Sequence, residues 1–248
     1  MKSQFYHTSD ARDAPLRIVA LGDELSRAGR SADSPAVPDC LAGLFRNEGL
    51  AVEIENLSRP HATADDGGRQ LRELAGAVDL AVVNFGLHES ITSHQTAERR
   101  YHPVQLGRWL WRTVCKSPRD VAPSGSDEAP VNGSPIDVFR RSIRQIIEEL
   151  RQRNPAVSIV LWAPYRPCDS ADLRQLSLAA SLTEYAITLE AVARQAGCYF
   201  LETDVLVSEV GLTNTADGES RERELRSRIA DEIFYLAGDA AYWNRRSA

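Results

Sequence analysis

Short apolar runs alternate with segments of helical periodicity along the chain. Five runs are rich in apolar residues. The first three end in glycine or polar residues; in the first, for example, Ile18 and Val19 are followed by Gly22 and Asp23. Such runs are typical of strands, and those without polar alternation are typical of strands buried on both faces of a parallel sheet. The expected strands are residues 16–21, 51–57, 79–85, 157–162 and 198–201.

The segments between these strands carry apolar residues at helical spacing. Helices are expected after Asp39, around Leu71, from Ile136 to Leu150, over 171–196 and from Leu225 to Leu236. This alternation predicts a three-layer α/β sandwich around a parallel sheet. Ligands bind outside the carboxyl ends of the strands in such folds. Because we expect the first three strands to be central, the loops that follow them mark the expected site.

A long segment after the third strand lacks this periodicity. Residues 116–135 are rich in proline, serine, glycine and aspartate, and long irregular segments inside domains are often functional. We therefore expect a single domain over 15–240 with an insertion, or lid, at about 88–135. A short aromatic helix is expected around Trp109, whose ring could support an acyl or sugar group or simply pack inward.

Composition narrows the class of protein. The chain has 248 residues, 43% hydrophobic content and a formal net charge of −6 without a basic stripe, so nucleic acid is not an expected partner. No apolar run is long enough for a transmembrane helix. Four cysteines without C-x-x-C spacing favour a reducing compartment. We expect a cytoplasmic protein with a small-molecule substrate or ligand, no membrane contact and a flexible tail over residues 1–14. The oligomeric state is left open.

Acidic residues and histidines gather in the loops that follow the first three strands. A further aspartate precedes the last expected helix. Carboxylates and imidazoles serve as general acids and bases, and they also bind transition metals. The candidate residues at this edge are Asp23, Glu24, His61, His88, Glu89 and Asp217.

The order of these segments resembles the SGNH, or GDSL-type, hydrolases. Ala20–Leu25 is similar to the Gly-Asp-Ser-Leu block of that family, and Asn56–Thr63 is similar to its second block. Val83–Glu89 resembles the third block, Gly-x-Asn-Asp, and Asp217–Ser220 resembles the final Asp-x-x-His block. The resemblance covers residues from about 16 to 237. It implies a five-stranded parallel sheet in flavodoxin-like order and an ester or acyl hydrolase site.

The residues that carry the family's chemistry are replaced in this chain. Glu24 stands where the resemblance places the nucleophilic serine, and Ser220 stands where it places the histidine. His61 and His88 take the positions of the oxyanion-hole glycine and asparagine, while Asp217 is kept. A serine hydrolase needs a nucleophile and a base within hydrogen-bond reach. The resemblance therefore implies the fold and the location of the site, without the standard serine mechanism.

Three hypotheses follow for the function. In the first, the chain is an enzyme with a rebuilt site, in which Asp23, Glu24, His88, Glu89 and Asp217 are catalytic. A divalent metal at Glu24, His61, His88 and Glu89 could assist it, and no other cofactor is expected. In the second, the chain is a non-catalytic binding or regulatory protein that keeps the cleft. In the third, a relocated serine is the nucleophile, and Ser26, Ser58 and Ser90 are the candidates.

Substrate contacts are expected from residues around the same site. His61, Arg99, Arg100 and Trp109 are the candidates. The arginines could pair with a carboxylate or phosphate on the substrate, since the guanidinium presents a fork of donors. A solvated pair of charges explains them equally.

Overall fold

The computed structural model describes residues 14–23, 26, 35–100, 134–165, 173–211 and 218–246. Its centre is a five-stranded sheet in the order β2-β1-β3-β4-β5. The strands are β1 (Leu16–Gly22), β2 (Val52–Asn56), β3 (Leu80–Asn84), β4 (Ser158–Trp162) and β5 (Tyr199–Leu201). Every neighbouring pair is parallel. The predicted parallel sheet in flavodoxin-like order is confirmed.

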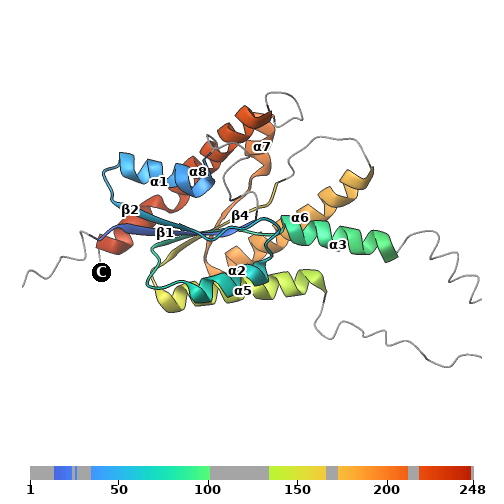
Figure 1. Cartoon of the computed structure of the whole chain (residues 1–248), viewed down its shortest axis with the longest axis horizontal. Helices are drawn as coiled ribbons and strands as arrows, with labels where there is room; N and C mark the ends of the chain where they lie inside the picture. Colours follow the sequence, from blue (N-terminus) through green and yellow to red (C-terminus); the bar gives the residue numbers. More distant parts are fainter. Residues whose placement is uncertain are drawn as a thin grey trace, which may run out of the picture.

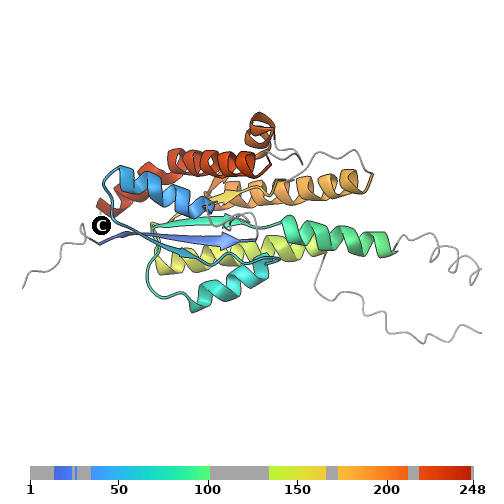
Figure 2. The same cartoon turned by 45° about the horizontal axis from the view of Figure 1, so that its top comes forward.

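Helices cover both faces of the sheet, as Figures 1 and 2 show. One face carries α1 and α8, which pack side by side, and the opposite face carries α2, α5 and α6. The two remaining helices, α3 and α7, follow the carboxyl ends of β3 and β5. The bounds are α1 (Val37–Asn47), α2 (Ala64–Glu73), α3 (Leu87–Arg100), α5 (Pro135–Arg153), α6 (Leu173–Ala196), α7 (Asp204–Val210) and α8 (Gly218–Arg246).

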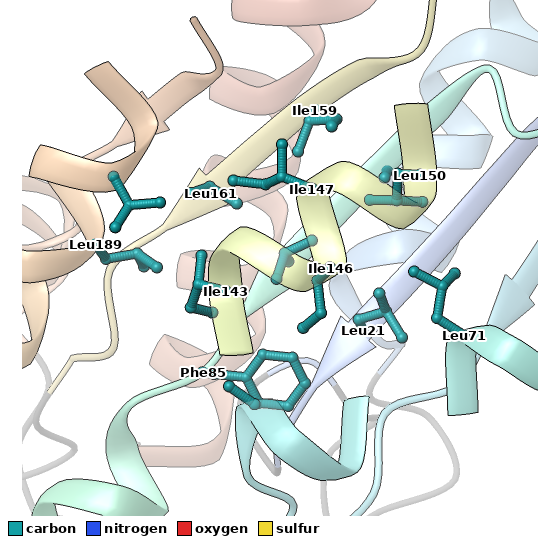
Figure 3. Close-up of a cluster of buried hydrophobic side chains, with 14 of the residues drawn as sticks. Leu21, Leu71, Phe85, Ile143, Ile146, Ile147, Leu150, Ile159, Leu161 and Leu189 are labelled. Atoms are coloured by element: carbon teal, nitrogen blue, oxygen red, sulfur yellow. The ribbon is translucent and has the colours of Figure 1, made fainter. Parts of the chain in front are cut away.

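The three central strands send alternate side chains into two separate cores. In β4, Val160 and Trp162 face the α1/α8 core, whereas Ile159 and Leu161 face the α5 side. Figure 3 shows the second core, where isoleucines of α5 lie over strand residues such as Leu161. Because successive strand residues point to opposite faces, a continuous apolar run is what a strand covered on both faces requires.

One expectation about the sheet is wrong. The strand after which His61 lies was expected to be central, but β2 is at an edge and pairs only with β1. Its acidic residues Glu53 and Glu55 are exposed and lie 3.8 and 3.7 Å from the guanidinium of Arg17. The alternation of apolar and charged residues in this strand was the signal for an edge position.

Two helices begin earlier than the sequence indicated. The chain enters α3 at Leu87 directly after β3, where a polar irregular segment was expected. Gly86, at φ 120°, makes this turn in a conformation that L side chains rarely adopt. Helix α8 begins at Gly218, so Ser220 lies on the helix rather than in the loop before it. The expected aromatic helix around Trp109 lies outside the described residues, as does the irregular segment at 116–135 except for its last two residues. Ser134 caps α5 and Pro135 is its first residue, so the irregular segment was predicted to end slightly too late.

The contact between α2 and Phe85 gives a stability prediction. A Cβ at Gly67 would lie 2.7 Å from Cε2 of Phe85, which is fully buried and has little room to move. We expect Gly67→Ala to lower the free energy of unfolding by about 1–3 kcal/mol through overpacking. Denaturant titration followed by circular dichroism measures the change.

The neighbouring glycine provides the matched control. A Cβ at Gly68 has its nearest contact at 3.9 Å, so Gly68→Ala should be neutral or stabilising by up to about 1 kcal/mol through helix propensity. Equal effects of the two alanines would contradict the packing argument.

Candidate functional site

The site is built on the carboxyl ends of β1 and β3, two neighbouring strands of the sheet. The amide of Asp23 donates to the carbonyl of Asn84 at 3.3 Å, and the amide of Arg59 donates to the carbonyl of Gly22 at 3.0 Å. These bonds join the ends of both strands to the loop after β2. Asp23 is 0% exposed, and its burial places a carboxylate inside the protein beneath this edge.

Two histidines, one from a loop and one from a helix, lie next to each other at this edge. The ring centroids of His61 and His88 are 5.3 Å apart, with the rings tilted by 51°. His61 is exposed in the loop between β2 and α2, and His88 is half-buried in the first turn of α3. The structure thus brings together two residues that are 27 positions apart in the sequence, 61 and 88.

His61 has an unusual backbone conformation. Its φ is 59°, which makes it the one residue other than glycine with positive φ in the part of the chain that the structure describes. This left-handed region favours glycine, although histidine enters it more readily than most residues. A glycine-like conformation agrees with the resemblance that aligns His61 with the oxyanion-hole glycine.

Glu89 holds the two loops of the site together. One carboxylate oxygen, Oε1, accepts the amide of Ala64 at 2.7 Å, and Oε2 accepts the amide of Gly86 at 3.1 Å. Ala64 is the first residue of α2, and Gly86 forms the turn into α3. Glu89 therefore fixes the segment that carries His61 against the helix that carries His88.

The environment of Glu89 changes its acidity. Burial raises the pKa of its carboxyl above the ordinary value of 4.5, and the hydrogen bonds from the backbone amides oppose that rise without cancelling it. With both oxygens bound to backbone amides, the geometry favours a positioning role over the catalytic role predicted from the sequence.

A capping box also fixes the N-terminus of α2. Thr63 and Asp66 form a reciprocal capping box, in which the Thr63 amide donates to Asp66 at 2.9 Å and the Asp66 amide donates to the Thr63 hydroxyl at 3.3 Å. Such boxes satisfy amides that the helix leaves unpaired. Because Thr63 lies two residues after His61, the cap limits the freedom of the His61 loop.

The serines considered as relocated nucleophiles are poorly placed for that role. Ser26, Ser58 and Ser90 are all buried. The hydroxyl of Ser90 donates to the carbonyl of Leu87 at 2.8 Å, as a helix serine commonly does. Burial away from solvent disfavours the hypothesis of a relocated serine.

Several other predicted site residues stay untested. Glu24, Trp109 and Asp217 lie outside the described residues. Arg99 and Arg100 belong to the last turn of α3, where the described structure is limited to the backbone. Their predicted roles stay predictions.

Three of the four metal ligands predicted from the sequence, His61, His88 and Glu89, are described by the structure. Within residues 14–23, 26, 35–100, 134–165, 173–211 and 218–246, no three His, Cys, Asp or Glu side chains form a group that could hold a metal ion. The two imidazoles lie together, but the carboxylate of Glu89 already accepts two backbone amides. A metal site here would need a further ligand, for which Glu24 is the candidate.

Sequence reasoning missed two buried polar residues beneath the site. Asn84 ends β3 and donates from its side chain to the carbonyl of Trp162 at 3.0 Å, which links the ends of β3 and β4. Tyr165 is buried beyond β4, and burial, followed by the charges of Glu222 and Asp23, raises its pKa. A polar residue at the last position of an apolar strand was the signal for Asn84.

The chain belongs to the GDSL-like lipase/acylhydrolase family. The family model matches residues 20–227, which include all five strands except the start of β1. This finding agrees with the resemblance drawn from the four sequence blocks. A search of curated proteins finds no significant match.

Solved structures with the same fold are distant in sequence. The crystal structure of TesA has 14% identity and a TM-score of 0.57, and the alignment covers 90% of this chain and 99% of TesA. A catalytic mutant of Axe2, an acetylxylan esterase from Geobacillus stearothermophilus, has 14% identity and a TM-score of 0.55, with 88% and 96% covered. An extracellular lipase from Streptomyces rimosus has 14% identity and a TM-score of 0.51, with 78% and 82% covered. These similarities establish the fold.

Within the described part of the chain, no helix combines the length and the apolar character needed to cross a bilayer.

The Glu89 bridge predicts a large loss of stability on truncation. Glu89→Ala would leave the amides of Ala64 and Gly86 without their acceptor, and an unsatisfied buried amide costs about 1–3 kcal/mol. We expect a loss of about 2–4 kcal/mol in the free energy of unfolding. The exposed Asp65, paired with Arg69 at 3.2 Å, is the control, and Asp65→Ala should cost less than about 1 kcal/mol.

The raised pKa of Glu89 predicts a pH dependence with a definite sign. The folded state holds this proton more tightly than the unfolded state, so the contribution to stability is complete below pH 4.5 and is lost as the pH rises through the folded pKa. The stability of the wild type relative to Glu89→Gln should therefore fall as the pH rises above about 4.5. Urea titrations across this range measure it, and a relative stability that increased with pH would refute the assignment.

Proposed function

We propose that the chain hydrolyses a small acyl or glycan ester without a serine nucleophile. The observation that carries this proposal is the contact between His61 and His88, whose rings lie 5.3 Å apart. The resemblance aligns these two positions with the family's oxyanion hole. Family membership supports hydrolysis of an ester as the reaction class. The replacements at positions 24 and 220 argue for a changed mechanism within that class.

The imidazoles could stabilise the charge that develops during ester hydrolysis. Attack on an ester carbonyl places negative charge on its oxygen, and donors aimed at that oxygen lower the barrier. A neutral imidazole carries one N–H donor and an imidazolium carries two. His61 and His88 would thus replace the backbone amide and the asparagine amide that the family resemblance implies at these positions.

Water would then act as the nucleophile, with Glu24 as the general base. The water oxygen bonds to the carbonyl carbon while its proton passes to the Glu24 carboxylate. The bond from carbon to the alcohol oxygen then breaks, and the alcohol leaves with that proton. No covalent acyl-enzyme forms on this route, so the absence of serine at position 24 is not an obstacle.

A divalent metal at the same residues is a variant of this proposal. Imidazole and carboxylate groups suit Zn, Mn or Fe, and His61, His88 and Glu24 are the candidate ligands. Glu89 is left out of this set because both of its oxygens accept backbone amides. A bound cation would polarise the ester carbonyl and acidify a water molecule. Elemental analysis of the purified protein tests for a bound metal. If the metal lies at these residues, His61→Ala should remove it.

The second candidate function is a binding protein that keeps the cleft without catalysis. Ser220, which stands at the position of the family's histidine, has an exposed side chain on α8 and offers no base at neutral pH. A small-molecule ligand, the absence of nucleic-acid and membrane partners, and a cytoplasmic location stay predictions under both functions.

The two functions and the serine mechanism are separated by one set of assays. We expect near-background turnover of p-nitrophenyl acetate and no labelling by a fluorophosphonate probe, because no serine occupies position 24. Acetylated xylo-oligosaccharides are the test substrate because the structurally similar Axe2 is an acetyl-xylooligosaccharide esterase. The protein should release acetate from them in a pH-stat assay. His88→Ala should lower kcat by about 10²–10³, the usual effect of removing one oxyanion donor.

Controls and contrary outcomes are well defined. Ser220→Ala should leave turnover unchanged, and Glu24→Gln should abolish it. Both variants and His88→Ala should keep a thermal midpoint near that of the wild type. Stoichiometric fluorophosphonate labelling with fast turnover would establish a serine hydrolase instead. Binding of the oligosaccharide with no acetate release from it or related esters would favour the binding protein.

A further inference from the structure

A cavity of about 440 Å³ lies between α6 and α7, beside the carboxyl end of β5. Its volume falls within the range of small-molecule sites, roughly 300–1,000 Å³. Strand β5 is the sheet edge opposite β2, two strands from β3 and three from β1. The lining also includes Ala163 and Pro164, which follow β4, and a Cβ at Gly86 would lie 3.1 Å from Cγ of Pro164, so the cavity extends to the turn into α3. Neither His61 nor His88 lines it, and the cavity is therefore distinct from the histidine pair.

Apolar side chains from three elements form much of its wall. Leu182 and Ile187 come from α6, Phe200 from β5 and Val207 from α7. Ile187 is 61% exposed, and Val205, next to the lining residue Asp204, is 59% exposed. Large apolar side chains left in solvent at the rim of a hollow are typical of a binding site, because a ligand would remove them from water.

Among the residues that the structure describes, the charged groups that line the cavity are all acidic. They are Glu190, Glu202 and Asp204, and no described lysine, arginine or histidine lines it. Glu190 pairs with Arg194 at 2.5 Å, which offsets its charge, so Glu202 and Asp204 carry the anionic character of the rim. Glu202, from the connection between β5 and α7, and Asp204, the first residue of α7, are both exposed. An anionic rim next to an apolar wall favours a cation with an apolar body.

We infer that this cavity binds a small organic cation of the arylalkylammonium class. The ammonium group would lie at the carboxylates of Glu202 and Asp204, where attraction is partly screened by solvent. The aromatic body would cover Ile187 and Phe200, and burial of that surface contributes roughly 25 cal/mol per Å². The hydroxyls of Thr183 and Ser208 also line the cavity and can accept hydrogen bonds from the ammonium group.

Three probes that share one aromatic body test the charge selectivity. 2-Phenylethylammonium, 2-phenylethanol and 3-phenylpropionate are titrated into the full chain, with binding followed by heteronuclear NMR. We expect the cation to bind about fivefold or more tightly than the alcohol, the propionate to bind weakest, and the advantage of the cation to shrink in high salt. Shifts should concentrate in the α6 and α7 amides.

Matched variants separate local charge from net charge. Glu202→Gln should weaken cation binding about three- to fivefold and leave alcohol binding unchanged. Glu184→Gln removes the same charge from an exposed position of α6 outside the cavity lining, and it should leave cation affinity unchanged. Ile187→Ser should weaken the cation and the alcohol alike, and His61→Ala should affect neither.

The outcomes that overturn the inference are specific. They are equal affinity for all three probes, equal effects of Glu202→Gln and Glu184→Gln, loss of cation binding in His61→Ala, and no binding of any probe at millimolar concentration. Circular dichroism of each variant confirms that it is folded. Because these measurements do not use turnover, failure of the proposed ester hydrolysis would leave the inference intact.

Discussion

The position of β3 is the constraint on which the rest of the structure depends. All five of its residues are buried, and it pairs with β1 on one side and β4 on the other. A strand of this kind is stable only when helices cover both faces, because neither side can meet water without cost. Its carboxyl end must then open in the middle of the sheet edge. The turn that follows β3 leads directly into α3, and this places His88 and Glu89 at the middle of the carboxyl edge of the sheet.

Glu89 converts this central position into a defined site. Its carboxylate joins the start of α2 to the start of α3, so the loop after an edge strand is held against the end of a central one. Removing a carboxylate from water is costly, and the raised pKa is the sign that two amide bonds offset the cost only in part. That arrangement persists because the two amides would otherwise lack an acceptor, a penalty of similar size.

The sequence predicts the sheet well because the local residue composition of a strand reflects how deeply the strand is buried. Apolar runs such as Leu80–Asn84 indicate buried strands. The order of the four blocks then indicates the order of the strands in the sheet. Less could be said of the site, since hydrogen bonds between loops have no local pattern. Nothing around Glu89 distinguishes a carboxylate that binds backbone amides from one that binds substrate or metal. The alternating charges of β2 indicate its edge position, and the flavodoxin-like order implied by the four blocks places the second strand there as well.

The conformation of His61 gives the remaining argument about the site. A residue with a Cβ at φ 59° carries a backbone cost of about 1–2 kcal/mol that glycine would avoid. The capping box at Thr63 and the Glu89 bridge over-determine the loop, and this is how a strained conformation is maintained. An imidazole held in a glycine-like position, with its ring against His88, brings no apolar burial in return because His61 is exposed. The structure thus tolerates local strain to present an aromatic base at the edge of the sheet, and this favours a chemical or binding role for the pair over a packing role.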